Sequence, residues 1–351
     1  MKRRAFASSG ASIAAALALA AAATAVQAQT LEQSQAALKR RDYAAAIAAL
    51  EPLAQVGDIQ AKGRLADLLL NAPAPHKDFS RGCTLAREGG EAGDALAQAA
   101  VAQCLVATGD PRALPKAREI ARMSMAQGEA AGAYMLYVAF IVDPANSYVR
   151  DGKADMAAYE ALAARPLEAR TEQSEAFDAL AFAATRGHTT AAVSLATYLY
   201  ETVAPRNVLR LREVIGALLK SGEKSAPLLE FQQRAGQVVT AGNTHASVRA
   251  FVDAYRVALA WAQAIDATAT KSKPCGEIRL LELVPHDLVD PVFLPQKNAD
   301  MQQTYLVNGT WDETWKFGGC GRESRVQVHF TADGWGGARF EVRALAAQPA
   351  H

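Results

Sequence analysis

Residues 78–105 have the sequence DFSRGCTLAREGGEAGDALAQAAVAQCL and contain the clearest copy of the unit around which this chain is organised. This stretch predicts a helix hairpin with a first helix to about Glu88, a turn that ends at Gly93, and a second helix from Ala95. The same frame recurs after five glycines: Gly57, Gly93, Gly128, Gly187 and Gly222. They are 36, 35, 59 and 35 residues apart, so a period near 35 is interrupted by one insertion. Such a period predicts stacked helix pairs, because a single pair cannot bury its own apolar face.

Positions counted from each glycine follow the same period. The fourth residue is small: Ala61, Ala97, Gly132, Ala191 and Ala226. The eighth and twelfth are apolar in the first four repeats, whereas the fifth has Glu230 and Arg234 there. Steps of four place these residues on one helical face, and the small residue allows two helices to approach closely. Four polar residues fifteen positions before a glycine are predicted to cap the first helices: Asp42, Asp78, Glu172 and Asn207.

This frame resembles the Sel-one-like repeat (SLR), a relative of the tetratricopeptide repeat. The resemblance rests on Asp42-Tyr43-Ala44-Ala45-Ala46, on Ala54 to Gly57, and on Ala61 and Leu65, and it covers roughly residues 42–235. Ala66, Ala102 and Ala196 depart from it, since the family prefers glycine there. The resemblance implies an all-α solenoid of about five repeats that acts as a scaffold, and it names no activity.

Residues 1–28 are typical of an export signal. Lys2-Arg3-Arg4 form a basic start, residues 13–26 an Ala/Leu-rich core, and Val26-Gln27-Ala28 a cleavage site. The general secretory route is favoured, and the twin-arginine route stays open because Arg3-Arg4 partly match its signal. We therefore expect a periplasmic or secreted protein with no stable membrane span.

The remaining chain is predicted to hold an SLR solenoid (29–243), a capping helix (244–270), a β domain (271–345) and a disordered tail (346–351). Within the solenoid, an insertion between Asp143 and Arg170 is expected to contain a short helix from Lys153 to Ala164. From Cys275 the apolar pattern switches to period two, which predicts a small antiparallel sheet. Residues of odd number are expected on its buried face: Tyr305, Val307, Trp311, Trp315 and Phe317.

The four cysteines are predicted to form two disulfides, because disulfides persist in exported chains. Three pairings are possible. Cys83 and Cys104 lie at matched heights on the two helices of one hairpin, which favours a bond between them. Cys275 then pairs with Cys320, and this staple suits a β domain of marginal size.

The composition argues against several function classes. The formal net charge is +1, so nucleic acid is not an expected partner. The six histidines are scattered without ligand spacing, so no metal or other cofactor is expected. Cys320 with His329 is one candidate catalytic pair, and Glu313 between two tryptophans is a second candidate. A disulfide for Cys320 and an ion pair at the rim for Glu313 are favoured instead, so no catalytic residue is predicted.

The function expected from the sequence is a non-enzymatic envelope scaffold that binds a protein or peptide partner. Arg118 and Arg122 are predicted partner contacts in a basic groove, Tyr159 in the insertion, and Trp335 at a turn tip. Two alternatives stay open: an envelope enzyme, such as a hydrolase or β-lactam-binding SLR protein, and a β domain that senses a small ligand on an inert solenoid.

Overall fold

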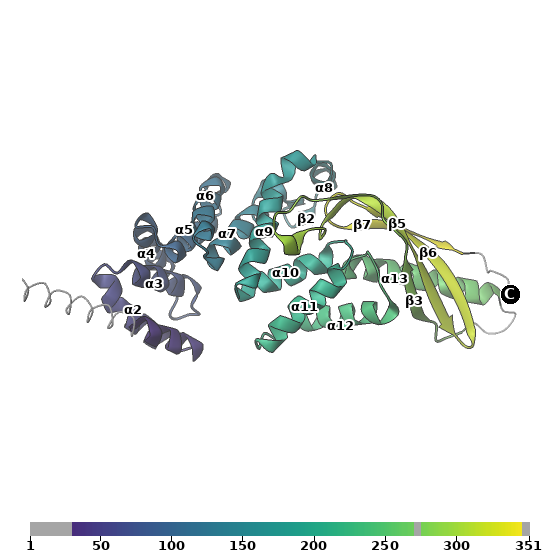
Figure 1. Cartoon of the computed structure of the whole chain (residues 1–351), viewed down its shortest axis with the longest axis horizontal. Coiled ribbons are helices and arrows are strands. Elements are labelled where there is room, and N and C mark those ends of the chain that lie inside the picture. Colours follow the sequence, from purple (N-terminus) through teal and green to yellow (C-terminus); the bar gives the residue numbers. More distant parts are fainter. Residues whose placement is uncertain (1–29, 270–274, 346–351) are drawn as a thin grey trace, which may run out of the picture. The chain divides into compact units, whose positions relative to one another are not determined.

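The structure is a computed structural model that describes residues 30–269 and 275–345 (Figure 1). The chain divides into two compact units, Met1–Met135 and Leu136–His351, and each is described by itself. The predicted export signal and tail lie outside the described residues, as does most of the linker that follows the capping helix. The described chain is mostly helical as far as Ala269 and then forms an antiparallel sheet, which confirms the coarse fold prediction.

The first unit consists of helices that pack in the order of the chain. They are α2 (Tyr43–Gln55), α3 (Ile59–Asn71), α4 (Phe79–Glu91), α5 (Ala95–Ala107), α6 (Leu114–Ala126) and the start of α7 (Ala130–Ile141). From α2 to α6 each helix packs against the next, and α3 also packs against α5. The helix pairs therefore fall where the glycine frame predicts them.

The turn glycines adopt the backbone conformation that their position requires. All five have φ between +84° and +94°: Gly57, Gly93, Gly128, Gly187 and Gly222. A residue with a Cβ atom is strained there, so glycine ends the first helix of each pair. The following residue then starts the second helix. The side chains of Asp58 and Asp94, for example, accept hydrogen bonds from backbone N–H groups three residues on, at 2.8 and 2.7 Å.

Two of the four predicted caps of first helices are confirmed and two are wrong. Asp42 and Asp78 each accept a backbone hydrogen bond at 3.0 Å from the residue three positions on. Glu172 instead lies inside the first turn of α9 (Thr171–Thr185). Asn207 is the first residue of α11 (Asn207–Lys220), and its buried amide donates to the carbonyl oxygen of Thr304 at 2.9 Å. It therefore holds the segment around Thr304 against the helices instead of capping one.

Small residues allow close helix contacts in the first unit. A Cβ atom at Gly132 on α7 would lie 2.2 Å from the Oγ of Ser124 on α6, so only glycine fits. Ala61 and Ala97 are fully buried at the equivalent positions. Ala226, in the fifth repeat, is exposed. The predicted small-residue contact thus holds in the earlier repeats and fails in the last.

Both predicted disulfides are confirmed. Cys83 on α4 bonds to Cys104 on α5, and Cys275 bonds to Cys320, with a Cα–Cα distance of 5.9 Å in each case. The first bond joins the two helices of one hairpin. The second joins two segments of the predicted β domain and closes a loop with a sequence separation of 45 residues.

The second unit begins with the rest of α7, and the insertion follows. The insertion contains a 3₁₀ turn (Pro144–Asn146), a two-residue hairpin of β1 (Val149–Arg150) and β2 (Lys153–Ala154), α8 (Met156–Ala163) and a second 3₁₀ turn (Leu167–Arg170). The predicted short helix is therefore present, but it begins three residues later because Lys153 belongs to the hairpin. Helices α9, α10 (Thr189–Glu201), α11, α12 (Ala226–Ala241) and α13 (Val248–Ala269) follow.

The sheet has five strands. They are β3 (Arg279–Pro285), β4 (Val289–Phe293), β5 (Leu306–Gly319), β6 (Arg322–Ala332) and β7 (Ala338–Ala344). Their order is β3-β5-β6-β7, all antiparallel, and β4 pairs with β5 beyond the end of β3. Strand β5 runs through Asn308-Gly309 without a turn, and the irregularities in its pairing to β4 lie at Val307 on β5 and at Asp290-Pro291 on β4.

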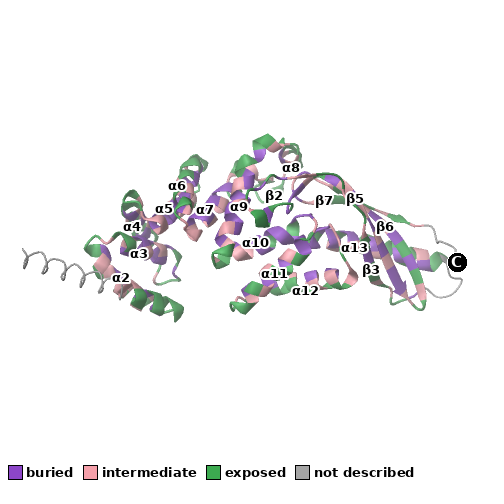
Figure 2. Ribbon diagram, in the orientation of Figure 1, coloured by how far each residue is buried: buried purple, intermediate pink, exposed green. Residues whose placement is uncertain are grey.

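The buried face of the sheet packs on α13. Trp311, Trp315 and Phe317 are fully or almost fully buried, as their odd parity predicts, and buried residues alternate along the strands (Figure 2). The prediction is wrong for Val307, which is only half-buried while Leu306 is fully buried, because the pairing shifts by one residue there. The ring of Phe251 on α13 lies 5.0 Å from that of Trp315. The predicted capping helix therefore covers the sheet, and both belong to one compact unit with α9–α12.

Over residues 30–269 and 275–345, no helix has the length and apolarity that crossing a membrane would need.

Candidate functional site

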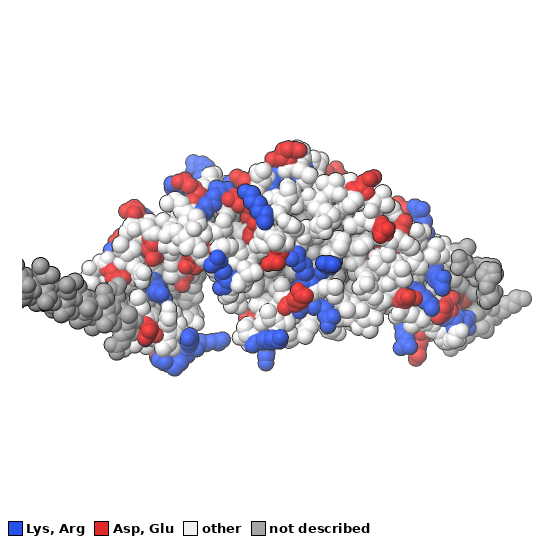
Figure 3. Space-filling view, viewed as in Figure 1, with Lys and Arg blue, Asp and Glu red and all other residues white. Residues whose placement is uncertain are grey.

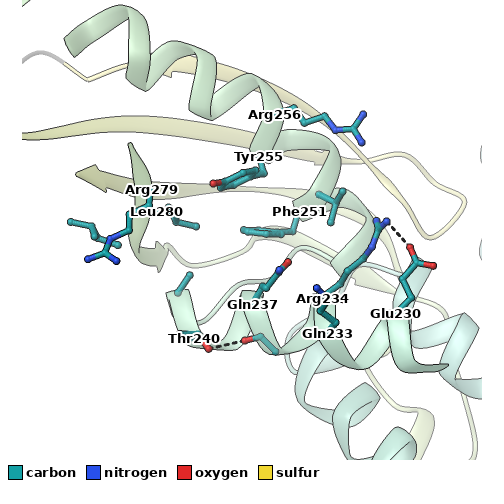
Figure 4. Close-up of a pocket in the computed structure, with 14 residues that line it drawn as sticks. Glu230, Gln233, Arg234, Gln237, Thr240, Phe251, Tyr255, Arg256, Arg279 and Leu280 are labelled. Carbon is teal, nitrogen blue, oxygen red and sulfur yellow. Dashed lines mark hydrogen bonds and ion pairs between the residues drawn. The ribbon is translucent and has the colours of Figure 1, made fainter. Parts of the chain in front are cut away.

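A wide groove lies between α12, α13 and β3 (Figure 4). Its volume is about 1060 Å³, slightly above the usual range for small-molecule cavities. One wall comes from α12, the floor from α13 and the far side from the first residues of β3. The groove lies wholly within the second unit.

The α12 wall is polar because one face of this helix carries hydrogen-bonding side chains. They recur at steps of three and four residues: Glu230, Gln233, Arg234, Gln237 and Thr240. Figure 4 shows Gln237 pointing toward the ring of Phe251. The side-chain amides of Gln233 and Gln237 form no hydrogen bond with any residue that the structure describes, so both are available to a ligand.

The floor of the groove is aromatic. Phe251 and Tyr255 are one helical turn apart on α13, with ring centroids 5.8 Å apart. Phe251 packs on Trp315, and Tyr255 lies 6.1 Å from Phe317, so the sheet core holds both rings in place. The Tyr255 hydroxyl has no hydrogen-bond partner within the described chain. The floor is therefore a rigid apolar surface with one free polar group.

Three arginines and one glutamate give the groove its charge. Arg234 is already paired with Glu230 at 2.5 Å and donates to the Tyr200 hydroxyl at 3.2 Å. Arg256 and Arg279 form no ion pair with any described residue, and both are exposed. On the face shown in Figure 3, acidic and basic side chains are interspersed. Two unpaired guanidinium groups at one cavity thus make it locally basic.

Strand β3 brings a free edge to the groove. One side of β3 pairs with β5. On its other side the described chain makes a single bridge, between Leu283 and Gly242 at the end of α12. The segment from Arg279 to Leu281, which lines the groove, has no strand partner on that side among the described residues.

Tyr159 and Trp335 lie together in a second, smaller recess of about 530 Å³. The Tyr159 hydroxyl donates to Asp333 Oδ2 at 2.5 Å, and Asp333 Oδ1 accepts from the backbone N–H of Trp335 at 2.8 Å. Burial, with the Asp333 carboxylate second, raises the pKa of Tyr159, which keeps the hydroxyl protonated as the donor. Trp335 is half-buried. The structure thus joins two residues that the sequence singled out separately.

Charged residues complete this recess. Arg249 pairs with Asp253 at 3.0 Å and more loosely with Glu201 at 3.8 Å. Burial raises the pKa of Glu201, and Arg249 opposes this. Arg170, only 2% exposed, donates to the backbone carbonyl of Gly334 at 2.6 Å and so holds the β6–β7 turn against the insertion.

Arg118 and Arg122 do not join either cavity. Arg118 is 8% exposed and Arg122 is half-buried, and both already interact with other groups. The expectation that Arg118 faces solvent is therefore wrong: the residue lies on the packed face of α6. The role of the two arginines in binding a partner stays a prediction.

The candidate catalytic groups from the sequence are engaged in structural contacts. Cys320 is in a disulfide, and His329 Nδ1 lies 2.9 Å from Asp312 Oδ1. Glu313 is fully buried and accepts hydrogen bonds from Trp311, Trp315, Thr244 and the His245 backbone, so its predicted place in an ion pair at the rim is wrong. In the part of the chain that the structure describes, no cluster of three or more His, Cys, Asp or Glu side chains is placed to hold a metal ion.

Sequence reasoning missed the groove, although a signal was present. Glu230 and Arg234 break the apolar pattern at the eighth and twelfth positions of the fifth repeat. In the first repeat these positions are Leu65 and Leu69, both buried. The break therefore marks the helix face that no further hairpin covers, and this face lines the groove.

Comparison with protein-family models, with curated proteins and with solved structures finds no match for this chain.

Proposed function

We propose that this protein is an exported scaffold, without catalytic activity of its own, that holds a protein or peptide partner, and that its helical part is a solenoid of Sel-one-like repeats. The repeat frame at Gly57 to Gly222 supports the solenoid. The two disulfides support export, because such bonds persist in oxidising compartments. The basic start and the cleavage site of the signal point to the periplasm or the exterior.

The groove between α12, α13 and β3 carries the proposal for binding. It combines a rigid aromatic floor with hydrogen-bonding side chains that have no partner among the described residues, namely Gln233, Gln237, Tyr255, Arg256 and Arg279. Buried aromatic anchors with arginine beside them are typical of protein–protein contact surfaces. An open groove also suits a chain segment better than a small molecule, which usually has most of its surface enclosed.

Site-specific crosslinking in cells tests this function. A photo-reactive amino acid at Gln233, on the groove wall, should capture a recurrent polypeptide that mass spectrometry identifies. The same amino acid at Gln232 is the matched control, because Gln232 is the adjacent exposed residue of α12 and does not line the groove. Equal capture from both positions, or no polypeptide from Gln233, would show that the groove is not the partner site.

A small cationic ligand in the recess at Trp335 is a second candidate function. Tyr148, Tyr159 and Trp335 supply aromatic rings, and Glu201 and Asp253 supply carboxylates, a combination that attracts ammonium groups. Arg249 competes for both carboxylates, which weakens this candidate. Titration with tetramethylammonium, followed by tryptophan fluorescence of the original chain and of Trp335→Phe, tests it, and an equal response of the two proteins at millimolar ligand would reject it.

A further inference from the structure

We propose that the groove receives an extended, acidic segment of a partner polypeptide, which adds as a strand to the free edge of β3. This inference rests on the proposed function and names the ligand class of the same site. Four features of the groove carry it: the strand edge, the length of the groove, its unpaired arginines, and an open glycine on α12.

The strand edge supplies backbone groups that an extended peptide can pair with. Arg279 and Leu280 pair with β5 on one side, Leu281 lies at an irregularity in this pairing, and on the other side all three residues face the groove. Gly242 closes this edge at Leu283, where a Cβ atom on Gly242 would lie 2.5 Å from the Leu283 carbonyl oxygen. An added strand is therefore stopped at Leu283, which limits its register. Addition of a strand to a sheet edge gives affinity through main-chain hydrogen bonds.

The length of the groove suits a short peptide. Its α12 wall runs from Glu230 to Ala241. At about 1.5 Å per helical residue this is roughly 16 Å, and an extended chain advances about 3.3 Å per residue. About five extended residues therefore fit. Alternate side chains of such a strand would lie on the rings of Phe251 and Tyr255, so we expect apolar residues at alternate positions.

The unpaired arginines select for carboxylates. Arg256 on α13 and Arg279 on β3 lie on two different sides of the groove, and neither is neutralised by a described residue. Arg234 is held by Glu230, so it contributes less. A guanidinium group binds a carboxylate through two parallel hydrogen bonds, which adds geometric selectivity to the attraction of opposite charges. Acidic residues beside the apolar ones would satisfy both arginines.

Gly236 adds no side chain to the α12 wall of the groove. It lies inside the helix, where glycine is unfavourable compared with alanine. A Cβ atom at this position would meet nothing within 4 Å, so no packing within the described chain requires glycine. Since Gly236 lines the groove, we attribute the presence of glycine here to the close approach of a ligand backbone. Gly216 in α11 has the same open surroundings outside the groove and provides a matched control.

Selection from a peptide library on the pure, full chain with both disulfides tests the proposal. The library holds random seven-residue peptides with acetylated and amidated ends, so that side chains carry the only charges. Enriched peptides should have at least two Asp or Glu residues alternating with apolar ones. The best peptide should bind about tenfold more weakly to Arg256→Gln and to Arg279→Gln, because each loses one charge-assisted contact.

Two further comparisons test the place and the mode of binding. Gly236→Leu should abolish binding of the selected peptide, whereas Gly216→Leu should leave its Kd unchanged, with circular dichroism confirming that both variants fold. A peptide with alternate backbone amides N-methylated on its pairing edge should bind at least tenfold more weakly, because it cannot donate to β3. Loss in Gly216→Leu as well, or no loss on N-methylation, would overturn strand addition in the groove.

The charge of the enriched peptides tests the acidic segment separately from the proposed function. If the enriched peptides are neutral or basic, or if none is enriched, the proposal of an acidic segment is wrong. Capture at Gln233 in cells can still hold in that case, and the groove would then bind a partner of different chemistry. If capture at Gln233 fails too, the proposed function fails with it.

Discussion

Glu313 Oε2 accepts a hydrogen bond from Trp315 Nε1 at 2.9 Å, and both side chains are fully buried. The other carboxylate oxygen accepts from Trp311 Nε1 at 3.0 Å and from Thr244 Oγ1 at 2.6 Å. The carboxylate thus joins two tryptophans of one strand to the segment that leads into α13. A buried carboxylate persists only where donors of this kind surround it.

We therefore expect Glu313→Gln to destabilise the second unit by about 1–3 kcal/mol. The new amide NH₂ would face donors that need an acceptor, so at least one buried hydrogen bond is lost. Urea unfolding followed by tryptophan fluorescence measures this. Glu323→Gln is the control, since Glu323 pairs with Lys316 at the surface and should change stability little. Equal effects of the two changes would contradict the structural role of Glu313.

Removal of the Cys275–Cys320 bond should loosen the sheet together with α13. A loop with a sequence separation of 45 residues corresponds to about 4 kcal/mol in the loop-entropy model. Because Phe251 of α13 packs on Trp315, we expect faster hydrogen exchange in both elements of a Cys275→Ser, Cys320→Ser variant. Protection retained in α13 alone would show that the sheet unfolds independently. Replacement of Cys83 and Cys104 should leave exchange in the sheet unchanged.

Acidification should weaken the contact between α13 and the β5–β6 turn. The hydrogen-bonded ion pair with Arg322, at 2.6 Å, is the first cause of the lowered pKa of Asp266, and a hydrogen bond from the Cys275 backbone adds to it. Since the folded-state pKa is lowered, the pair stabilises the fold above the ordinary carboxyl pKa of about 3.9, and this stabilisation is lost as the pH falls through the lower, folded value.

The variant Asp266→Asn isolates this effect. The difference in unfolding free energy between the original chain and the variant should be constant above roughly pH 5 and should shrink toward pH 3. Urea titrations at a series of pH values measure it. A difference that stays constant down to pH 3 would show that Asp266 does not titrate with folding.

The four tryptophans should divide into two classes in acrylamide quenching. Trp311 and Trp315 are 1% and 0% exposed, so their fluorescence should resist the quencher. Trp261 is 43% exposed and Trp335 is half-buried in the recess, so both should be quenched. Trp335→Phe should remove part of the quenchable signal and leave the protected part intact. An unchanged quenchable fraction would mean that Trp335 is covered in solution.

The helix pairs and the Cys83–Cys104 bond were predictable because their causes are local, and the Cys275–Cys320 bond then followed as the remaining pair. A glycine with positive φ, a capping residue after it and apolar residues at steps of four act within one or two helical turns. Cys83 and Cys104 are on two helices joined by one short turn. The number of residues between each cysteine and the turn therefore fixes its position along the helix axis, and the two positions match. The odd parity of Trp311, Trp315 and Phe317 likewise follows from the pleat of one strand.

The groove and the recess were not predictable, because each is made by segments far apart in the sequence. Tyr159 and Asp333 are 174 residues apart and meet through one hydrogen bond. The groove needs α12, α13 and the edge of β3 at once. Within a single repeat, the sequence signals the groove through Glu230 and Arg234, which stand where earlier repeats have apolar residues.

The period of the helix pairs, their turns, the change to strands after Cys275 and the Cys83–Cys104 bond follow from the sequence, since each depends on residues within one element or one hairpin. Tertiary packing sets three other features: Glu313 is buried beneath two indoles, Arg118 packs inward, and α13 covers the sheet. The physical reason is that burial depends on which apolar faces meet. That choice is made by packing across the whole unit and not by the period of any one segment.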